Sequence, residues 1–166
     1  MYDYVLQYGF DNKTQNYIQS IKDHLKANKI DDKERAWLPH ITIDLYDCKN
    51  EQEFIDEVDK VVNKIQKFNI EFKNLNNFKG RTLYIEPYNT EILMNLKSLF
   101  NTDLDRYRLE NRREKVYTPH ATLCTNDTLE KSLKLVKEKF YPFSGIVKYI
   151  WIYNEDIKLI KEYELK

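Results

Sequence analysis

The sequence predicts an α+β protein of two lobes related by a pseudo-two-fold axis, each with an antiparallel sheet flanked by helices and with a groove between them. Three observations support this fold class. Both halves of the 166-residue chain show the same order of elements, both carry the same short motif, and the two copies lie 80 residues apart. A repeat close to half the chain length indicates two similar lobes rather than a solenoid. We expect one domain over residues 1–166, with lobe repeats at approximately 1–79 and 80–166.

The first half alternates between strand and helix patterns. Strands are predicted from β-branched and aromatic runs, and helices from apolar residues three and four apart. A proline is tolerated at the first residue of a strand, so the second strand begins just after Pro39. The predicted elements are, in order, a strand at 2–10, a helix from 14 to about 26, a charged loop at 31–35, a strand at 40–46, a helical pattern at 54–68 and an extended segment at 69–72.

The second half restates this order. Asn89 or Thr90 is expected to cap its first helix, and Asp127, with Glu130 three residues later, its second. Residues 154–156 are a candidate hairpin turn. The predicted elements are a strand at 81–88, a helix around 92–100, a charged loop at 101–115, a strand at 120–124, a helix around 129–140 and strands at 144–153 and 157–165.

The shared motif is a tetrad, Pro-His-Ile-Thr at 39–42 and Pro-His-Ala-Thr at 119–122. In a shuffled chain of this composition about 0.004 matches to Pro-His-x-Thr are expected, so composition does not explain two. Duplication of a purely structural strand is the alternative. Residues i and i+2 of a strand point to one face, which places each histidine beside a threonine hydroxyl, whereas Ile41 and Ala121 point into the packed interior.

If the lobes face each other, both pairs converge on one cleft that suits a phosphodiester or cyclic phosphate. One neutral histidine can take a proton from the attacking water or hydroxyl, while the other, protonated, donates to the leaving oxygen. The ordinary histidine pKa of about 6.5 lets both forms coexist near neutrality. The threonine hydroxyls can donate to the non-bridging phosphate oxygens. The predicted catalytic residues are therefore His40, His120, Thr42 and Thr122.

Two aromatic and two basic residues near the tetrads are candidate substrate contacts. Trp37 and Tyr117 each lie three residues before a histidine and could stack on a nucleobase, although packing is the alternative for both. Arg112 and Arg113 lie in the charged loop before the second tetrad and could hold a flanking phosphate. Acidic residues are interleaved with them, so a solvated loop that pairs with itself is the alternative there.

Several kinds of site are excluded by composition and spacing. Lys plus Arg equals Asp plus Glu at 27 each, so no global basic field attracts nucleic acid. The histidines and cysteines lack zinc-ligand spacing, and the glycines form no phosphate-binding loop, so we expect no metal and no cofactor. His24 has no motif around it and is expected on the surface. No stretch is apolar enough to span a membrane, and Cys48 and Cys124 are predicted to be buried thiols of a cytoplasmic protein.

The paired motifs, HITI at 40–43 and HATL at 120–123, resemble those of the 2H phosphoesterase superfamily, in particular its 2′-5′ RNA ligase-like or cyclic phosphodiesterase branch. The resemblance covers nearly the whole chain in its order of elements. It implies a bilobal fold with the histidines facing each other across a groove, no metal, and substrates that contain 2′,3′-cyclic phosphates or 2′-5′ linkages.

The expected function is that of a metal-independent phosphodiesterase acting on such bonds in RNA or nucleotides, as a monomer. Two alternatives stay open: ATP-independent 2′-5′ joining of RNA ends by the reverse reaction, and an RNA-binding module that keeps the fold without turnover. Intact tetrads in both halves speak against the second.

Overall fold

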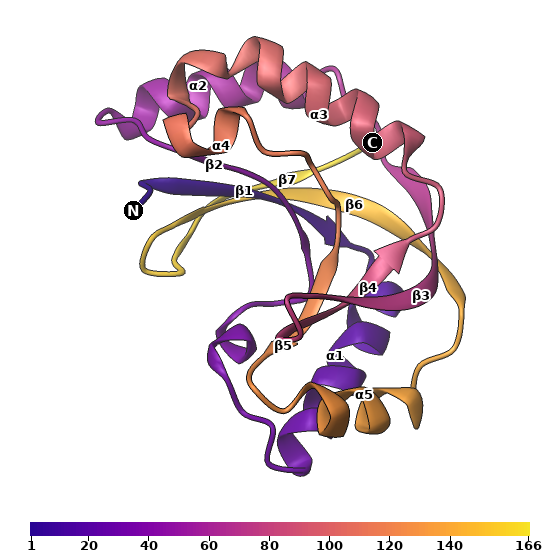
Figure 1. Ribbon diagram of the computed structural model, residues 1–166. Coiled ribbons are helices and arrows are strands. Elements are labelled where there is room, and N and C mark those ends of the chain that lie inside the picture. The colour runs from indigo at the N-terminus through magenta and orange to yellow at the C-terminus, as the bar shows by residue number, and fades with distance from the viewer.

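A computed structural model describes residues 1–166 and shows a strongly curved sheet with helices on its outer side (Figure 1). The elements are β1 (Tyr4–Phe10), α1 (Asn12–Ala27), β2 (Ile41–Tyr46), α2 (Glu51–Val62), β3 (Phe68–Phe78), β4 (Thr82–Pro87), α3 (Glu91–Asp103), α4 (Glu110–Arg113), β5 (Ala121–Thr125), α5 (Leu129–Lys137), β6 (Phe143–Asn154) and β7 (Leu159–Glu164), with 3₁₀ turns η1 (Lys33–Ala36) and η2 (Asp105–Tyr107). The α+β class and the antiparallel pairing predicted from the sequence are confirmed.

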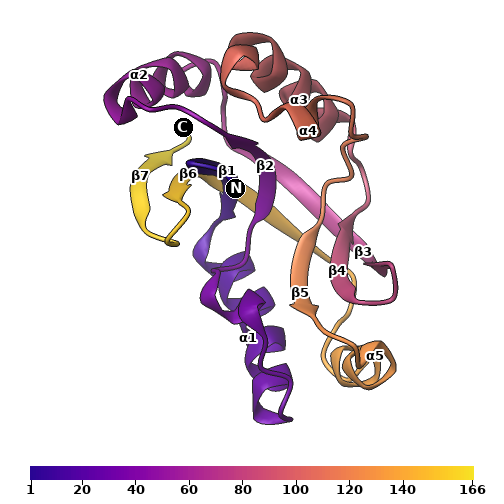
Figure 2. The ribbon, with the colours of Figure 1, turned by 60° about the vertical axis from the view of Figure 1, so that its left-hand side comes forward.

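The seven strands form one continuous antiparallel sheet in the order β2-β1-β6-β3-β4-β5, with β7 paired to β6. The long strand β6 joins the two lobes, because its residues 143–147 pair with β3 while 147–154 pair with β1. Curvature brings the two ends of this order together, so that β2 and β5 lie side by side (Figure 2). This juxtaposition places the two tetrads next to each other.

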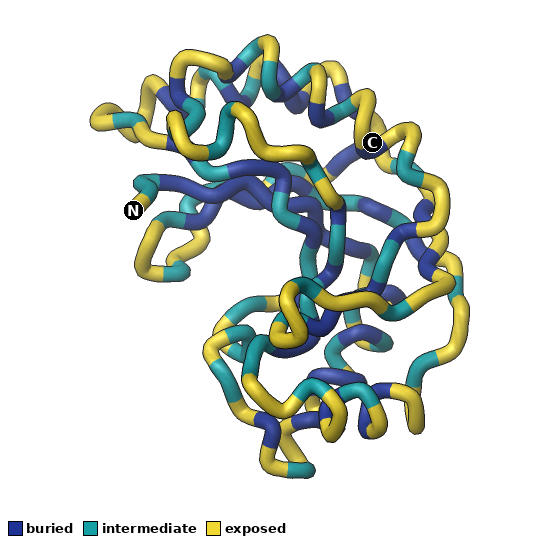
Figure 3. Tube along the Cα trace, viewed as in Figure 1, coloured by how far each residue is buried: buried dark blue, intermediate teal, exposed yellow.

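The helices are exchanged between the halves of the chain. Helix α1, from the first half, packs against α5 and β5 of the second, whereas α3, from the second half, packs against α2 (Figure 1). One cluster of 33 buried residues includes members from both halves, such as Tyr8 of β1 and Phe100 of α3, whose rings lie 6.4 Å apart. Neither half therefore has a core of its own, and the buried strands lie at the centre of the molecule (Figure 3).

The pseudo-symmetry extends to the irregularities of the strands. In the β1–β2 pair the register slips so that Gln7 lies opposite Thr42, and in the β4–β5 pair it slips at the corresponding point so that Tyr84 lies opposite Thr122. Such bulges bend a strand and redirect its side chains, and they are common beside active sites. The two tetrads thus have the same local strand geometry.

Most predicted boundaries agree with the structure to within three residues. The predicted charged loop at 101–115 is not a plain loop, because it contains the end of α3, the turn η2 and the helix α4. Helix α2 ends at Val62 rather than continuing to 68, and β3 extends to Phe78, beyond the predicted 72. Thr128, not Asp127, is the N-cap residue of α5; Asn126 accepts the hydrogen bond from the Thr128 amide, 2.8 Å, while Asp127 pairs with Arg81. No local pattern distinguishes these neighbouring capping residues.

The cap of α3 agrees with the expectation, whereas one of the two cysteines differs from it. Thr90 is the N-cap residue of α3, but the Asn89 side chain accepts the amide hydrogen bond, from Glu91 at 3.2 Å. Cys124 is buried as predicted, but Cys48 is only half-buried, because it lies in the turn before α2. None of the helices is long and apolar enough to cross a lipid bilayer.

Candidate active site

One cavity of about 360 Å³ contains both histidines and both threonines of the tetrads. His40 immediately precedes β2, and His120 immediately precedes β5, so the side-by-side packing of these strands brings together residues 80 positions apart. Ile41 and Ala121 are fully buried on the opposite face, as the strand alternation requires. The cavity is lined by Tyr2, Val5, Gln7, Lys33, Glu34, Trp37, His40, Thr42, Leu45, Phe78, Thr82, His120, Thr122 and Thr125.

The two imidazoles are held in the same way. The Nδ1 atom of His40 lies 2.7 Å from the carbonyl oxygen of Leu38, and that of His120 lies 2.7 Å from the carbonyl oxygen of Thr118. A carbonyl oxygen can only accept, so Nδ1 carries a proton and donates in both cases. Each Nε2 is then left to take a proton or, in the imidazolium form, to give one.

Burial makes both imidazoles poor cations in the free protein. It lowers the pKa of His40 to about 4, a shift that the Leu38 carbonyl opposes and the charges of Lys22 and His120 reinforce. Burial also lowers the pKa of His120, with opposition from the Thr118 carbonyl and reinforcement by Arg112. An anion bound between them would act in the opposite direction and favour the protonated form.

Aromatic rings flank each histidine. The Trp37 ring lies 5.6 Å from that of His40, and the rings of Phe78 and Tyr84 lie 4.8 Å and 5.1 Å from that of His120. Trp37 is held in part by the buried ammonium of Lys22, which donates to the Trp37 carbonyl at 2.6 Å. Trp37 is half-buried and lines the cavity, so its ring is available to a ligand.

The other predicted contacts fall in different places. Tyr117 and Arg112 line an adjoining cavity that also contains Thr42 and His120. The Tyr117 hydroxyl donates to the Thr42 carbonyl oxygen at 2.8 Å and so ties the second tetrad to β2. Arg113 lines neither cavity, because its guanidinium pairs with Asp105 at 2.7 Å and Glu110 at 3.3 Å. The predicted contact between Arg113 and the substrate therefore does not fit this geometry.

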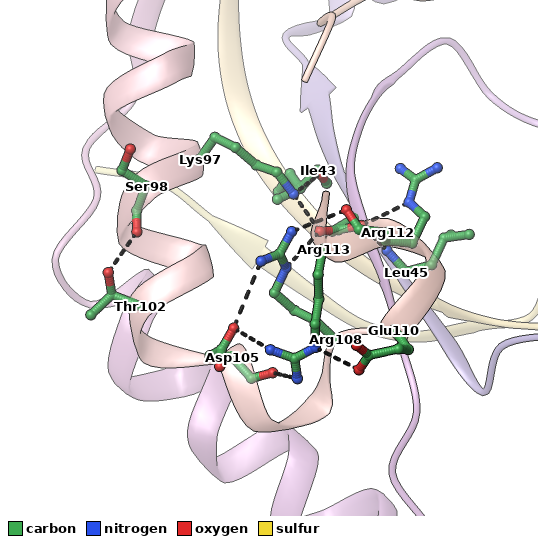
Figure 4. Close-up of polar contacts among 11 residues, drawn as sticks. Ile43, Leu45, Lys97, Ser98, Thr102, Asp105, Arg108, Glu110, Arg112 and Arg113 are labelled. Atoms are coloured by element: carbon green, nitrogen blue, oxygen red, sulfur yellow. Dashed lines mark hydrogen bonds and ion pairs between the residues drawn. The ribbon is translucent and has the colours of Figure 1, made fainter. Parts of the chain in front are cut away.

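A buried carboxylate, Asp44, organises the wall of this adjoining cavity. It is 1% exposed and pairs with Lys97, with Arg108 at 3.1 Å and with Arg112 at 3.0 Å. Burial alone would raise its pKa, but the hydrogen bond and charge of Lys97, with further hydrogen bonds from the Leu45 amide and Arg112, hold the pKa below its ordinary value. Figure 4 shows the basic side chains converging from α3 and the loop around α4.

Sequence reasoning missed Gln7, Lys97 and Asp44. Gln7 is 2% exposed, lies opposite Thr42 and lines the cavity with both histidines. The available signal was a polar residue inside an otherwise apolar strand, and the same holds for Asp44. His24, expected on the surface, lies 2.8 Å from Glu138 across the α1–α5 contact and away from the cavity. No group of three or more His, Cys, Asp or Glu side chains is placed to hold a metal ion.

Comparison with known proteins agrees with this geometry. The family model of the 2′-5′ RNA ligase superfamily matches residues 10–157, which is most of the chain. The chain belongs to this superfamily. Comparison with curated protein sequences finds no match.

Solved structures share the fold at low sequence identity. Escherichia coli LigT in complex with 3′-AMP is 13% identical with a TM-score of 0.65, over 99% of this chain and 98% of that one. TT0787 of Thermus thermophilus is 10% identical with a TM-score of 0.66, over 98% and 97%. Kluyveromyces marxianus Usb1 is 11% identical with a TM-score of 0.53, over 98% and 96%. The superfamily member described here thus has the LigT-like fold over its whole length.

Proposed function

We propose that this superfamily member is a metal-independent phosphodiesterase that opens 2′,3′-cyclic phosphates or cleaves 2′-5′ phosphodiester bonds of nucleotides or RNA ends. The observation that carries the proposal is the single cavity in which two imidazoles, both with a free Nε2, lie with two threonine hydroxyls. Such an arrangement supplies a base, an acid and two hydrogen-bond donors without a metal.

In the hydrolytic reaction a water oxygen attacks phosphorus while the bond to the ribose 2′ or 3′ oxygen breaks. The neutral histidine takes the proton of the water at Nε2, and the protonated histidine gives its proton to the ribose oxygen that leaves. The product is a phosphomonoester, and the exchanged protons return through solvent. Which histidine is acid follows from the orientation of the substrate, since both hold Nδ1 on a backbone carbonyl oxygen and leave Nε2 free.

The threonines and the aromatic wall supply binding in this scheme. The hydroxyls of Thr42 and Thr122 donate to the non-bridging oxygens, where negative charge grows in the transition state. Trp37, beside His40, is suited to stack on the base. E. coli LigT has been crystallised with 3′-AMP, with ATP and with phosphate, which supports a nucleotide as the ligand of this related chain.

The test is turnover of adenosine 2′,3′-cyclic phosphate and of a 2′-5′ linked diadenylate, measured with and without EDTA. We expect activity that survives EDTA and that falls at least about 100-fold in His40→Ala and in His120→Ala. The His24→Ala variant, altered outside the cavity, serves as the matched control. Activity that disappears in EDTA, or a His40→Ala variant with the wild-type rate, would refute the proposal.

The reverse reaction is distinguished by its product. RNA ends that carry a 2′,3′-cyclic phosphate and a 5′-hydroxyl are offered together, and joined RNA is sought by gel electrophoresis. An RNA-binding module without turnover would retain affinity for these ends while both assays stay silent.

A further inference from the structure

A second cavity of about 330 Å³ adjoins the proposed catalytic cavity and shares Thr42, Phe78 and His120 with it. We call it the anion cavity. Its other lining residues come from β2, α3 and the segment before β5, and they are Asp44, Lys97, Arg112, Lys115, Val116, Tyr117 and Thr118. A substrate whose reacting phosphate lies between the histidines would therefore extend into it on the His120 side.

The charge of the anion cavity differs from that of its neighbour. Three cations, Lys97, Arg112 and Lys115, line it with a single carboxylate, Asp44, so its net charge is two positive. The cavity around Trp37 is lined by one cation, Lys33, and one carboxylate, Glu34, and has no net charge. Because the whole chain is neutral, positive potential is concentrated locally on the His120 side.

Arg112 is oriented for a ligand by the buried carboxylate. Its Nε lies 3.0 Å from Asp44, and neither of its terminal amino groups forms a hydrogen bond within the protein. Figure 4 shows that end of the guanidinium turned away from the contact with the carboxylate. A guanidinium fork fixed in this way matches two oxygens of a phosphate.

Lys115 adds a positive charge that has no acidic partner in the protein. It is exposed, lines the anion cavity and forms no ion pair. Lys97, in contrast, already donates two hydrogen bonds, one to the Asp44 carboxylate and one to the Ile43 carbonyl oxygen. The cavity therefore contains one oriented guanidinium and one free ammonium beside a neutral histidine.

We propose that the anion cavity binds a second phosphate group of the substrate, adjacent to the phosphate that reacts. The proposal rests on the function proposed above for the identity of the first phosphate. It narrows the substrate class to nucleotides that carry a further phosphate on the 5′ side of the reacting nucleoside. That phosphate is either a 5′-phosphomonoester or the internucleotide phosphodiester of an oligonucleotide.

Binding of three product-like ligands tests the proposal by calorimetry. The probes are adenosine 3′-phosphate, adenosine 3′,5′-bisphosphate, and a diadenylate with a 5′-hydroxyl and a 3′-phosphate. We expect the wild-type protein to bind at least one of the two-phosphate ligands at least about tenfold more tightly than adenosine 3′-phosphate, since two charge-assisted contacts are added. The ligand that gains identifies the source of the second phosphate.

The variants locate the effect. In Lys115→Gln and Arg112→Gln we expect the affinity ratio between two-phosphate and one-phosphate ligands to fall toward one. Arg106→Gln, altered at an exposed arginine that pairs with Glu53 outside both cavities, should keep the wild-type ratio. Lys115→Gln decides the question if Arg112→Gln disturbs the buried network around Asp44.

Equal affinities for all three probes in the wild type, or a Lys115→Gln variant that keeps the full ratio, would overturn the inference. None of the probes contains a 2′,3′-cyclic phosphate or a 2′-5′ linkage, which are the bonds that the proposed hydrolysis breaks. The binding result therefore does not depend on turnover. A protein without phosphodiesterase activity that still binds the two-phosphate ligands more tightly would refute the proposed function. It would still support a second phosphate site in the anion cavity.

Discussion

Two opposed influences, burial and a hydrogen bond to a backbone carbonyl oxygen, set the protonation state of His40 and His120. Burial disfavours the cation, while a backbone carbonyl at 2.7 Å holds the Nδ1 proton and fixes the tautomer. Both imidazoles are consequently neutral near pH 7 in the free protein, and one must gain a proton before it can act as an acid. Under the proposed function we expect the negative charge of the bound substrate to raise the pKa of these histidines, which couples binding to activation.

This coupling predicts different pH optima for kcat/KM and kcat. kcat/KM reports the free enzyme, in which the pKa of His40 is lowered to about 4 and that of His120 lies below 6.5. We therefore expect the bell-shaped profile of kcat/KM to have its optimum on the acid side of pH 6.5 and to fall below about pH 4, where His40 also becomes protonated. The kcat optimum should lie at higher pH, because bound phosphate raises both pKa values. Coincident optima for the two parameters would contradict this account.

A second prediction at this scale concerns the threonine hydroxyls. Thr42→Val keeps the shape of the side chain and removes one donor to the phosphate, so kcat should fall by about 100- to 1,000-fold. Thr42→Ser, which keeps the hydroxyl, should retain most of the rate. Steady-state kinetics on a 2′,3′-cyclic nucleotide makes the comparison, and a Thr42→Val variant as active as Thr42→Ser would exclude the assigned role.

Among the elements, the segments just before β2 and β5 contain the two histidines of the proposed site, and buried lysines donate hydrogen bonds to the backbone near them. Lys22 of α1 is 2% exposed and donates to the carbonyl oxygens of Glu34 at 3.0 Å and Trp37 at 2.6 Å. Lys97 of α3 donates to the Ile43 carbonyl oxygen at 2.9 Å beside the anion cavity. Each buried ammonium thus donates to backbone carbonyl oxygens away from bulk water.

Lys22→Met tests the positioning of the Trp37 segment. The variant keeps an apolar stem but removes the hydrogen bonds that Lys22 donates to the Trp37 and Glu34 carbonyl oxygens, of which the Glu34 oxygen still accepts from the Trp37 amide at 3.1 Å. We expect the free energy of unfolding to fall by about 1–3 kcal/mol. We also expect faster proteolysis within residues 31–37. Lys26→Met, at an exposed position of the same helix, is the control and should match the wild type in chemical denaturation and in proteolysis.

The sequence was sufficient to predict the helices and strands that have a strong local pattern and the placement of the two tetrads at the start of strands. Strand alternation correctly places Ile41 and Ala121 in the core. The repeat correctly predicts that the two histidines have similar local surroundings, since each Nδ1 contacts the carbonyl oxygen two residues before it. The roles of Asp44 and Arg113 could not be predicted, because each is decided by partners far away or in a loop without periodicity. Asp44 meets residues 53 to 68 positions away, and Arg113 turns toward Asp105 rather than the groove.

For the whole molecule, strand β6 is the element on which both lobes depend. Val147 is fully buried and pairs with Phe10 of β1 and with Phe68 of β3. Since the core is continuous and the sheet unbroken, the two lobes cannot unfold independently without breaking this strand. The separation of the two histidines is likewise set through the curvature of one sheet rather than by a flexible linker.

Val147→Ala tests this cooperativity. Removal of two buried methyl groups should lower the free energy of unfolding by about 2 kcal/mol. Unfolding followed by circular dichroism and by tryptophan fluorescence should remain one coincident transition. Val116→Ala, at a side chain that is 89% exposed, should leave stability unchanged. Two separate transitions would show that the lobes fold as independent units.

The exchange of helices between the halves has a consequence for how such a chain can be divided. The exposed turn at Lys79 and Gly80 separates fragments in which the strands of one are covered by a helix of the other. Fragments 1–79 and 80–166 would each expose apolar surface alone and would bury it by associating with one another. We therefore expect the two fragments to form a complementation pair, in which recovered activity of the proposed site signals that the fragments have associated.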